Sequence, residues 1–201
     1  MKSIGISQRM DPIEGRNEAR DALDVEWPRL LWDLGYLPVT LSSAIEATDR
    51  YLAELKLDGY ILSGGGDIGT ALSRDRLETA VLEDSIRRQV PVLGVCRGMQ
   101  FINHYQGGSL KSVNGHIATR HPLQGAWSTE LGIDTVNSFH GLGLMAETLG
   151  RDLETLAAAK DGVIEALRHE QHSWLGIMWH PEREQPFQVT DTQLIKSLFG
   201  D

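Results

Sequence analysis

Short apolar runs alternate with amphipathic stretches over the first hundred residues of the chain. Four runs have the length and composition of strands, at residues 2–7, 36–41, 58–63 and 90–95. The stretches between them fit a helical pattern, at residues 27–34, 45–55 and 74–89. Strands and helices in this order predict a doubly wound, mostly parallel α/β sheet flanked by helices, because parallel strands need crossover connections.

Other segments predict less regular structure. Residues 8–24 are polar and contain Pro12 and Gly15, so we expect a long connecting loop there. Residues 109–131 look irregular, and a strand is expected at 133–137. Three later runs predict a small antiparallel C-terminal extension, with Asp161-Gly162 as a hairpin turn: 153–159, 163–168 and 174–179. A last helix carries Leu194, Ile195 and Leu198 on one face.

Length and composition fit a single domain spanning 1–201, with 41% apolar and 23% charged residues. The net charge of −9 disfavours non-specific binding to nucleic acid or membrane, which positive surface charge drives. The single cysteine cannot form an internal disulfide. No signal peptide and no apolar run of about 18–20 residues is recognisable. We therefore expect a cytoplasmic protein.

The fourth run leads into Gly94-Val95-Cys96-Arg97-Gly98, followed by a sequence compatible with a helix. This pattern is typical of a nucleophile elbow, where two glycines allow a sharp turn from strand to helix. Cys96 would sit at the helix N-terminus, where the helix dipole favours a thiolate and the N–H of Arg97 faces a developing oxyanion. A lone cysteine is more often a small packing residue, but the flanking glycines favour a nucleophile.

Two more signals fall at predicted strand ends. Gly64-Gly65-Gly66-Asp67 lacks the pattern of a phosphate loop, and we expect it to bring a backbone N–H to an oxyanion. His180-Pro181-Glu182 closes the run at 174–179. If Pro181 keeps the chain extended, residues i and i+2 point to the same side, so Glu182 can orient the His180 imidazole as the base for a cysteine.

A metal site is not expected. The candidate ligands are His104, His116 and His121, whose spacings of twelve and five residues match no compact ligand set. No second cysteine is available. We predict that these histidines are solvated or serve packing.

Together, Ser63 to Asp67, Gly94 to Gln100 and His180-Pro181-Glu182 resemble the motifs of the class I glutamine amidotransferase superfamily, over most of the chain and in the family's order. The resemblance implies a Cys-His-Glu triad that cleaves a γ-glutamyl amide through a thioester, with no cofactor. It makes Cys96 the nucleophile, His180 the base and acid, and Glu182 the orienting carboxylate.

The resemblance also implies binding roles. The N–H groups of Arg97 and of Gly65 or Gly66 would form the oxyanion hole. The α-amino and α-carboxylate ends of the glutamyl group would be held by the residues at five matching positions: Gln100, Asn137, Ser138, Phe139 and His140.

Within the superfamily, Cys-Arg-Gly at the elbow favours the free-standing γ-glutamyl hydrolases. Residues 158–166 and 176–184 are most similar to hydrolases of γ-glutamyl-CDP-amidate, which release cytidine diphosphoramidate and glutamate in capsule phosphoramidate biosynthesis. A γ-glutamyl-γ-aminobutyrate-type hydrolase and a glutaminase subunit serving a separate synthase stay as alternatives. The intact triad disfavours a non-enzymatic binding protein, and Gln100 disfavours a peptidase.

The expected partner is a small γ-glutamyl molecule, and a homodimer is left open. If the substrate carries a diphosphate, we expect cations near the rim of the site to bind it, with five candidates: Arg9, Arg97, Lys111, Arg120 and His121.

Overall fold

A seven-stranded sheet forms the centre of the computed structural model, which describes residues 1–200. Its strand order is β11-β12-β13-β6-β5-β1-β4. The strands from the first half of the chain, which pair in parallel, are β1 (Ser3–Ile6), β4 (Leu37–Thr40), β5 (Gly59–Leu62) and β6 (Val92–Val95). This confirms the predicted α/β sheet.

The C-terminal strands continue the same sheet. They are β11 (Leu153–Ala158), β12 (Ile164–His169) and β13 (Trp174–Ile177). β11 and β13 both pair antiparallel with β12, as expected for the extension. β13 also pairs in parallel with β6, so the extension is joined to the main sheet rather than separate from it.

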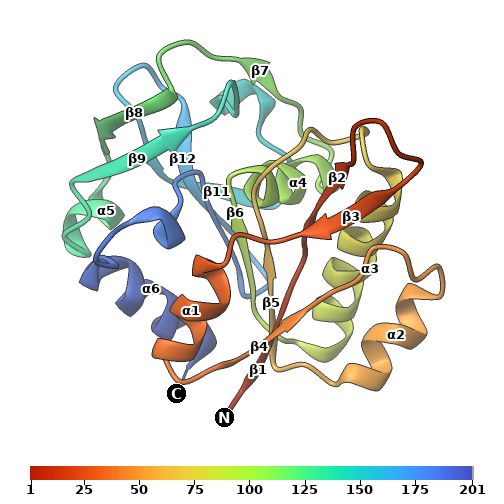
Figure 1. Cartoon of the computed structure of the whole chain (residues 1–201). Helices are drawn as coiled ribbons and strands as arrows, with labels where there is room; N and C mark the ends of the chain where they lie inside the picture. The colour runs from red at the N-terminus through yellow and green to blue at the C-terminus, as the bar shows by residue number, and fades with distance from the viewer. Residues whose placement is uncertain (201) are drawn as a thin grey trace.

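Helices cover both faces of the sheet (Figure 1). On one face, α4 (Arg97–Tyr105) contacts β5, β6 and β13, and α3 (Leu72–Arg88) contacts β5 and α2 (Thr48–Leu55). On the other face, α1 (Glu26–Asp33) lies beside α6 (Val189–Phe199). Every residue of β5 and β6 is buried, as expected for parallel strands between two helical layers.

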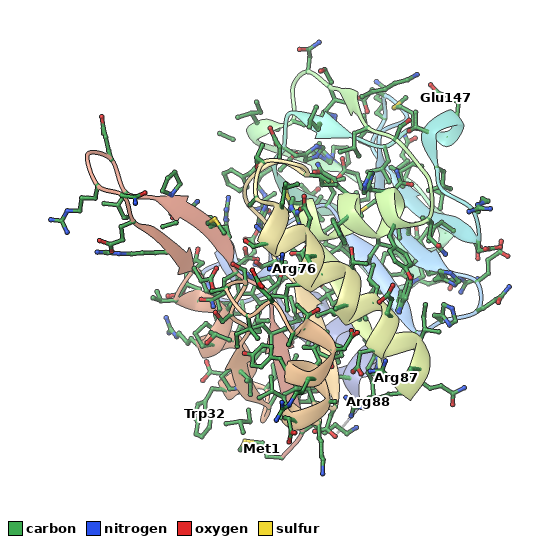
Figure 2. The ribbon with its side chains drawn as sticks, turned by 90° about the vertical axis from the view of Figure 1, so that its right-hand side faces the viewer. Met1, Trp32, Arg76, Arg87, Arg88 and Glu147 are labelled. Atoms are coloured by element: carbon green, nitrogen blue, oxygen red, sulfur yellow. The ribbon has the colours of Figure 1, made fainter. Side chains whose placement is uncertain are left out.

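The predicted loop at residues 8–24 is wrong. This segment forms a hairpin of β2 (Arg9–Pro12) and β3 (Ala19–Ala22), which Figure 2 shows standing out from the body of the protein. Its residues are exposed or only partly buried, so there is no apolar alternation to mark the strands. At its base the Asp21 carboxylate accepts hydrogen bonds from the Ser43 hydroxyl, at 2.7 Å, and from the Ser43 N–H, at 2.9 Å.

Residues 109–131 are also more regular than predicted. They contain β7 (Lys111–Ser112), β8 (Ile117–Pro122) and α5 (Ala126–Glu130). β8 pairs with β9 (Thr135–Phe139), and β7 pairs with β10 (Leu142–Gly143). Two 3₁₀ turns complete the fold, η1 (Ala146–Thr148) and η2 (Pro181–Arg183). Among residues 1–200, no helix has both the length and the apolar character to cross a membrane.

Candidate active site

Three neighbouring parallel strands bring their carboxyl ends to one edge of the sheet. β5 leads to Gly64, β6 to Cys96 and β13 to His180, three positions far apart in the sequence. Their closeness is visible at Gly64, where a Cβ atom would lie 2.7 Å from His180 Cε1 and 3.6 Å from Cys96 Cβ. The strand ends thus place a thiol, an imidazole and a glycine loop together, where ligands bind in open α/β sheets.

Cys96 occupies a strained backbone conformation between β6 and α4, with φ 52° and ψ −105°. The turn is possible because two glycines are in tight contact with their surroundings. A Cβ on Gly98 would lie 2.0 Å from the carbonyl oxygen of Leu62, and one on Gly94 would lie 2.7 Å from the carbonyl oxygen of Gly98. These contacts confirm the predicted elbow and explain why both glycines are needed.

The carboxylate of Glu182 holds the imidazole of His180. His180 Nδ1 and Glu182 Oε1 are 2.7 Å apart, and both side chains are 2% exposed. Burial alone would lower the pKa of His180, but hydrogen bonds with Cys96 and Glu182 and the negative charge on both partners raise it to about 9. The predicted contact is therefore present. The predicted extended backbone is wrong, because Pro181 begins the 3₁₀ turn η2.

A cleft of about 390 Å³ opens beside Cys96. Eight residues expected at the site line it: Cys96, His180, Arg97, Gln100, Phe139, His140, Gly65 and Gly66. Arg183, which was not expected there, lines it as well. Asn137 and Ser138 are not among the lining residues, although they belong to the same predicted set.

Asn137 instead holds the backbone of His180. Its Nδ2 donates to the His180 carbonyl oxygen at 2.8 Å, and its Oδ1 accepts from the His180 N–H at 2.9 Å. Ser138 is fully buried, and its hydroxyl donates to the carbonyl oxygen of His116 at 2.7 Å. Both side chains lie in β9 and support the site from behind.

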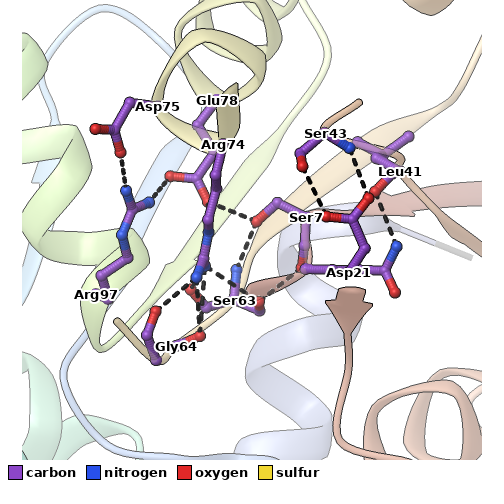
Figure 3. A network of polar contacts seen from close by, with 12 residues as sticks. Ser7, Asp21, Leu41, Ser43, Ser63, Gly64, Arg74, Asp75, Glu78 and Arg97 are labelled. Atoms are coloured by element: carbon purple, nitrogen blue, oxygen red, sulfur yellow. Dashed lines mark hydrogen bonds and ion pairs between the residues drawn. The ribbon is translucent and has the colours of Figure 1, made fainter. Parts of the chain in front are cut away.

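The glycine loop is held by Arg74, a residue that the sequence analysis missed. Arg74 is 1% exposed on α3 and donates to the carbonyl oxygens of Ser63 and Gly65, both at 2.6 Å (Figure 3). Its Nε binds Glu78 at 2.8 Å. Burial lowers the pKa of Arg74 to about 10, so it stays charged at neutral pH. Only an arginine can bridge these three acceptors with one planar group.

The side chain of Arg97 joins the same network, between Asp75 and Glu78 (Figure 3). It is 2% exposed, and burial lowers its pKa to about 9, so that it too remains a cation. The guanidinium of Arg97 thus already has two carboxylate partners inside the protein. The expectation that the Arg97 side chain binds a diphosphate at the rim is wrong, because the guanidinium is committed to α3.

The other expected rim cations are scattered. Arg9 lines a second cavity of about 230 Å³, which shares Gly65, His180 and Arg183 with the cleft. Lys111 pairs with Glu147 at the surface, and Arg120 with Glu184. His121 faces Glu165, with its Nε2 3.4 Å from the Oε1 of that carboxylate.

Arg183 was not predicted as a residue of the site. It lines both cavities, with its guanidinium 4.6 Å from the centre of the Phe139 ring.

Comparison with known proteins gives matches along nearly the whole chain. A family model described as Peptidase C26 matches residues 3–182. Gamma-glutamyl-CDP-amidate hydrolase of Campylobacter jejuni is 35% identical over 206 residues, covering 98% of this chain and 97% of the relative. Gamma-glutamyl-gamma-aminobutyrate hydrolase of Escherichia coli is 27% identical over 220 residues, covering 89% and 85%.

Solved structures agree on the fold. A protein of Thermoplasma acidophilum, assigned to GMP synthase as one of its subunits, matches with a TM-score of 0.76 at 20% identity, covering 100% of this chain and 93% of the other. A glutamine amidotransferase of Thermotoga maritima matches with a TM-score of 0.67 at 15% identity, covering 98% and 83%. The architecture is therefore that of the glutamine amidotransferases, as the sequence motifs implied.

Proposed function

Since this chain belongs to the peptidase C26 family, we propose that it hydrolyses a γ-glutamyl amide through Cys96, with γ-glutamyl-CDP-amidate as its substrate. The observation that supports this reaction is a cysteine with a strained backbone in the lining of a cleft, beside an imidazole in hydrogen-bond contact with a buried carboxylate. The 35% identity to the C. jejuni hydrolase over almost its whole length carries the choice of substrate.

The reaction has two halves. In the first, the Cys96 sulfur attacks the γ-carbonyl carbon, the C–N bond breaks, and the proton on His180 passes to the departing nitrogen. Cytidine diphosphoramidate leaves and a glutamyl thioester remains on Cys96. In the second, His180 takes a proton from a water molecule whose oxygen attacks the thioester. The C–S bond breaks, glutamate leaves, and the sulfur and imidazole return to their starting state. Glu182 orients His180 throughout.

Two backbone N–H groups would stabilise the oxyanion in both halves. Arg97 is the first residue of α4, so its N–H has no acceptor within the helix. In the loop, Arg74 binds the carbonyl oxygen of Gly65. Because C=O and N–H point in opposite directions across a trans peptide, the N–H of Gly66 is turned away from Arg74. Arg74 also donates to the carbonyl oxygen of Gly64 at 3.4 Å, which turns the N–H of Gly65 away in the same manner. These contacts support an oxyanion hole, with the N–H of Gly65 or Gly66, that is formed before substrate binds.

The glutamyl end would lie in the 390 Å³ cleft. The Nε2 atom of Gln100 already donates to the carbonyl oxygen of Leu142 at 2.8 Å, which leaves its Oε1 to accept from an α-ammonium group. The leaving group would extend into the adjoining 230 Å³ cavity, which Arg9 and Arg183 line. Of the five rim cations named from the sequence, Arg9 is kept as a diphosphate ligand, and Arg183 is added.

The test is glutamate release from γ-glutamyl-CDP-amidate, γ-glutamyl-γ-aminobutyrate and glutamine, with Cys96→Ala as the blank. We expect a preference of about 100-fold or more in kcat/KM for the nucleotide substrate, which equals about 2.7 kcal/mol of transition-state discrimination. Arg9→Gln and Arg183→Gln should raise KM for that substrate and leave the γ-aminobutyrate substrate unaffected. Slow release from all three compounds would refute the proposal and favour a glutaminase that needs a synthase partner.

A further inference from the structure

Four side chains from separate parts of the chain meet in a cluster that includes His140, a residue of the cleft lining. They are His116 before β8, His121 within β8, His140 after β9 and Glu165 in β12. One ring nitrogen of each histidine and one oxygen of Glu165 all lie within 4.8 Å of one another. His116 is buried and His121 half-buried, so neither is a solvated histidine, and both rings pack together as the other part of the expectation had it. The antiparallel pairing of β8 and β9 brings them to His140.

The facing atoms of this cluster are buried and lack hydrogen bonds. Both oxygens of Glu165, whose side chain is fully buried, are without a hydrogen-bond partner in the described structure. So are His116 Nδ1, His140 Nε2 and both ring nitrogens of His121. A buried carboxylate without a hydrogen bond is strongly unfavourable, so an arrangement that leaves four groups in this state calls for a partner at their centre.

In a neutral histidine, the hydrogen bond made by one ring nitrogen determines whether the other nitrogen, here the one that faces the cluster, carries a proton or a lone pair. His140 Nδ1 is 3.0 Å from the carbonyl oxygen of Leu142, an acceptor, so Nδ1 carries the proton. His116 Nε2 is 2.9 Å from Asp161 Oδ2, also an acceptor, so Nε2 carries the proton there. In the neutral rings, His140 Nε2 and His116 Nδ1 are lone pairs that point at the Glu165 carboxylate. A cation between these atoms makes that arrangement attractive without a second proton on either ring.

The separations from Glu165 fit a tetrahedral metal ion, while the whole set of ligand atoms extends to 4.8 Å, so the imidazoles would move closer together around a bound ion. Glu165 Oε1 is 3.3 Å from His116 Nδ1, 3.4 Å from His121 Nε2 and 3.4 Å from His140 Nε2. Four ligands placed tetrahedrally at the usual 2.0–2.1 Å from zinc are about 3.3–3.4 Å from one another. The outer contacts of His116 and His140, to a carboxylate and a carbonyl oxygen, are those that histidine ligands of metals usually make.

We propose that His116, His121, His140 and Glu165 bind a zinc ion in a tetrahedral site. The set of three imidazoles and one carboxylate suits zinc, and with Asp161 in the outer shell the charges sum to zero. A surface cavity of about 430 Å³, lined by His116, His121 and Asp161 among others, gives the ion a path of entry. With four protein ligands the site is closed, so the ion has a structural role.

A bound zinc ion would restrain the segment around His140, which forms part of the lining of the active cleft. His140 lies both in the cluster and in the lining of the cleft beside Cys96. The ion would join that segment to β8 on one side and to β12 of the central sheet on the other. This inference concerns binding and does not depend on the proposed reaction.

The test uses the full chain, stripped with a chelator, transferred to chelator-free buffer at pH 7.5 and titrated with Zn²⁺ by calorimetry. We expect one ion per chain, and Co²⁺ in its place should give the intense visible absorption of a tetrahedral site. His121→Ala should weaken binding by about 100-fold or more. Asp161→Asn, a half-exposed residue whose change spares the cluster, should weaken it by about 10-fold.

Matched controls distinguish this site from other histidines and from the thiol. His104→Ala changes an exposed histidine of α4, and Cys96→Ala removes the cysteine; both should bind zinc as the unmodified protein does. Circular dichroism checks that each variant is folded. If the unmodified protein takes up no zinc, or if His121→Ala and Asp161→Asn both bind it unchanged, the proposal is refuted and the cluster is a set of charged histidines around Glu165.

Discussion

Replacing Glu182 by glutamine should move the pH dependence of catalysis, because this carboxylate is one of the two groups that raise the pKa of His180. That pKa is raised from 6.5 to about 9 despite burial. The difference corresponds to about 3 kcal/mol in favour of the imidazolium. In the proposed reaction the imidazolium donates the proton to the leaving nitrogen, so activity is present below the folded pKa and is lost as the pH rises through about 9.

Glu182→Gln removes the negative charge while the burial that opposes the imidazolium stays. We therefore expect the basic limb of kcat/KM, which reports the free enzyme, to move down by at least about one pH unit. Loss of an orienting carboxylate also disturbs the tautomer of the base, so kcat should fall by about 10²–10⁴. Glutamate release measured from pH 6 to 10.5 gives both values.

Glu154→Gln is the matched control, because Glu154 forms an exposed ion pair with Arg168 away from the site. Its profile should coincide with that of the unmodified protein. A basic limb that stays near pH 9 in Glu182→Gln would refute the reasoning, since it would show that some other group sets the pKa of the proton donor.

Three further outcomes are expected. Arg74→Lys keeps the charge but cannot reach Gly65, Ser63 and Glu78 together, so kcat should fall by about 10²-fold at nearly constant KM; a change confined to KM would contradict the preformed oxyanion hole. Gly98→Ala should lower the free energy of unfolding by about 3 kcal/mol or more, measured in urea, and an unchanged midpoint would disprove the steric argument. Burial raises the pKa of Asp191 from 3.8 to about 6, so its charged form destabilises the fold increasingly as the pH rises from about 4 to 6. Asp191→Asn should accordingly stabilise the protein at pH 7.5, by up to about 3 kcal/mol, and have no effect below pH 4; equal effects at both values would contradict this linkage.

The parts of the site that could be predicted from sequence are those written in short, contiguous signals. Gly94 to Gly98 marks the elbow because its two glycines flank Cys96 in one contiguous motif, although Gly98 makes its closest contact with Leu62 of the neighbouring strand β5. His180 and Glu182 are two residues apart, so almost any local backbone lets them meet, and the prediction survived an incorrect view of that backbone. The strands of the central sheet were predictable because burial on both faces leaves runs of apolar residues.

What sequence reasoning missed depends on contacts between distant segments. Arg74 looks like one more charged residue on a helix until the carbonyl groups of Ser63 and Gly65 are placed beside it. The histidine cluster is invisible for the same reason, since β8, the end of β9 and β12 must all be placed before its members meet. Spacing along the chain is a guide to metal sites only when one turn or hairpin supplies the ligands.

The place of β13 in the sheet determines at which stage of folding His180 comes to lie beside Cys96. β13 lies between β12 and β6, and it pairs Trp174 with Val92, so the imidazole reaches Cys96 only after a closure over some 80 residues of chain. During synthesis the elbow and the glycine loop precede the base, and Cys96 then has neither His180 nor Glu182 beside it. In the proposed reaction, a newly made chain is thus inert toward γ-glutamyl amides until β13 has entered the middle of the sheet.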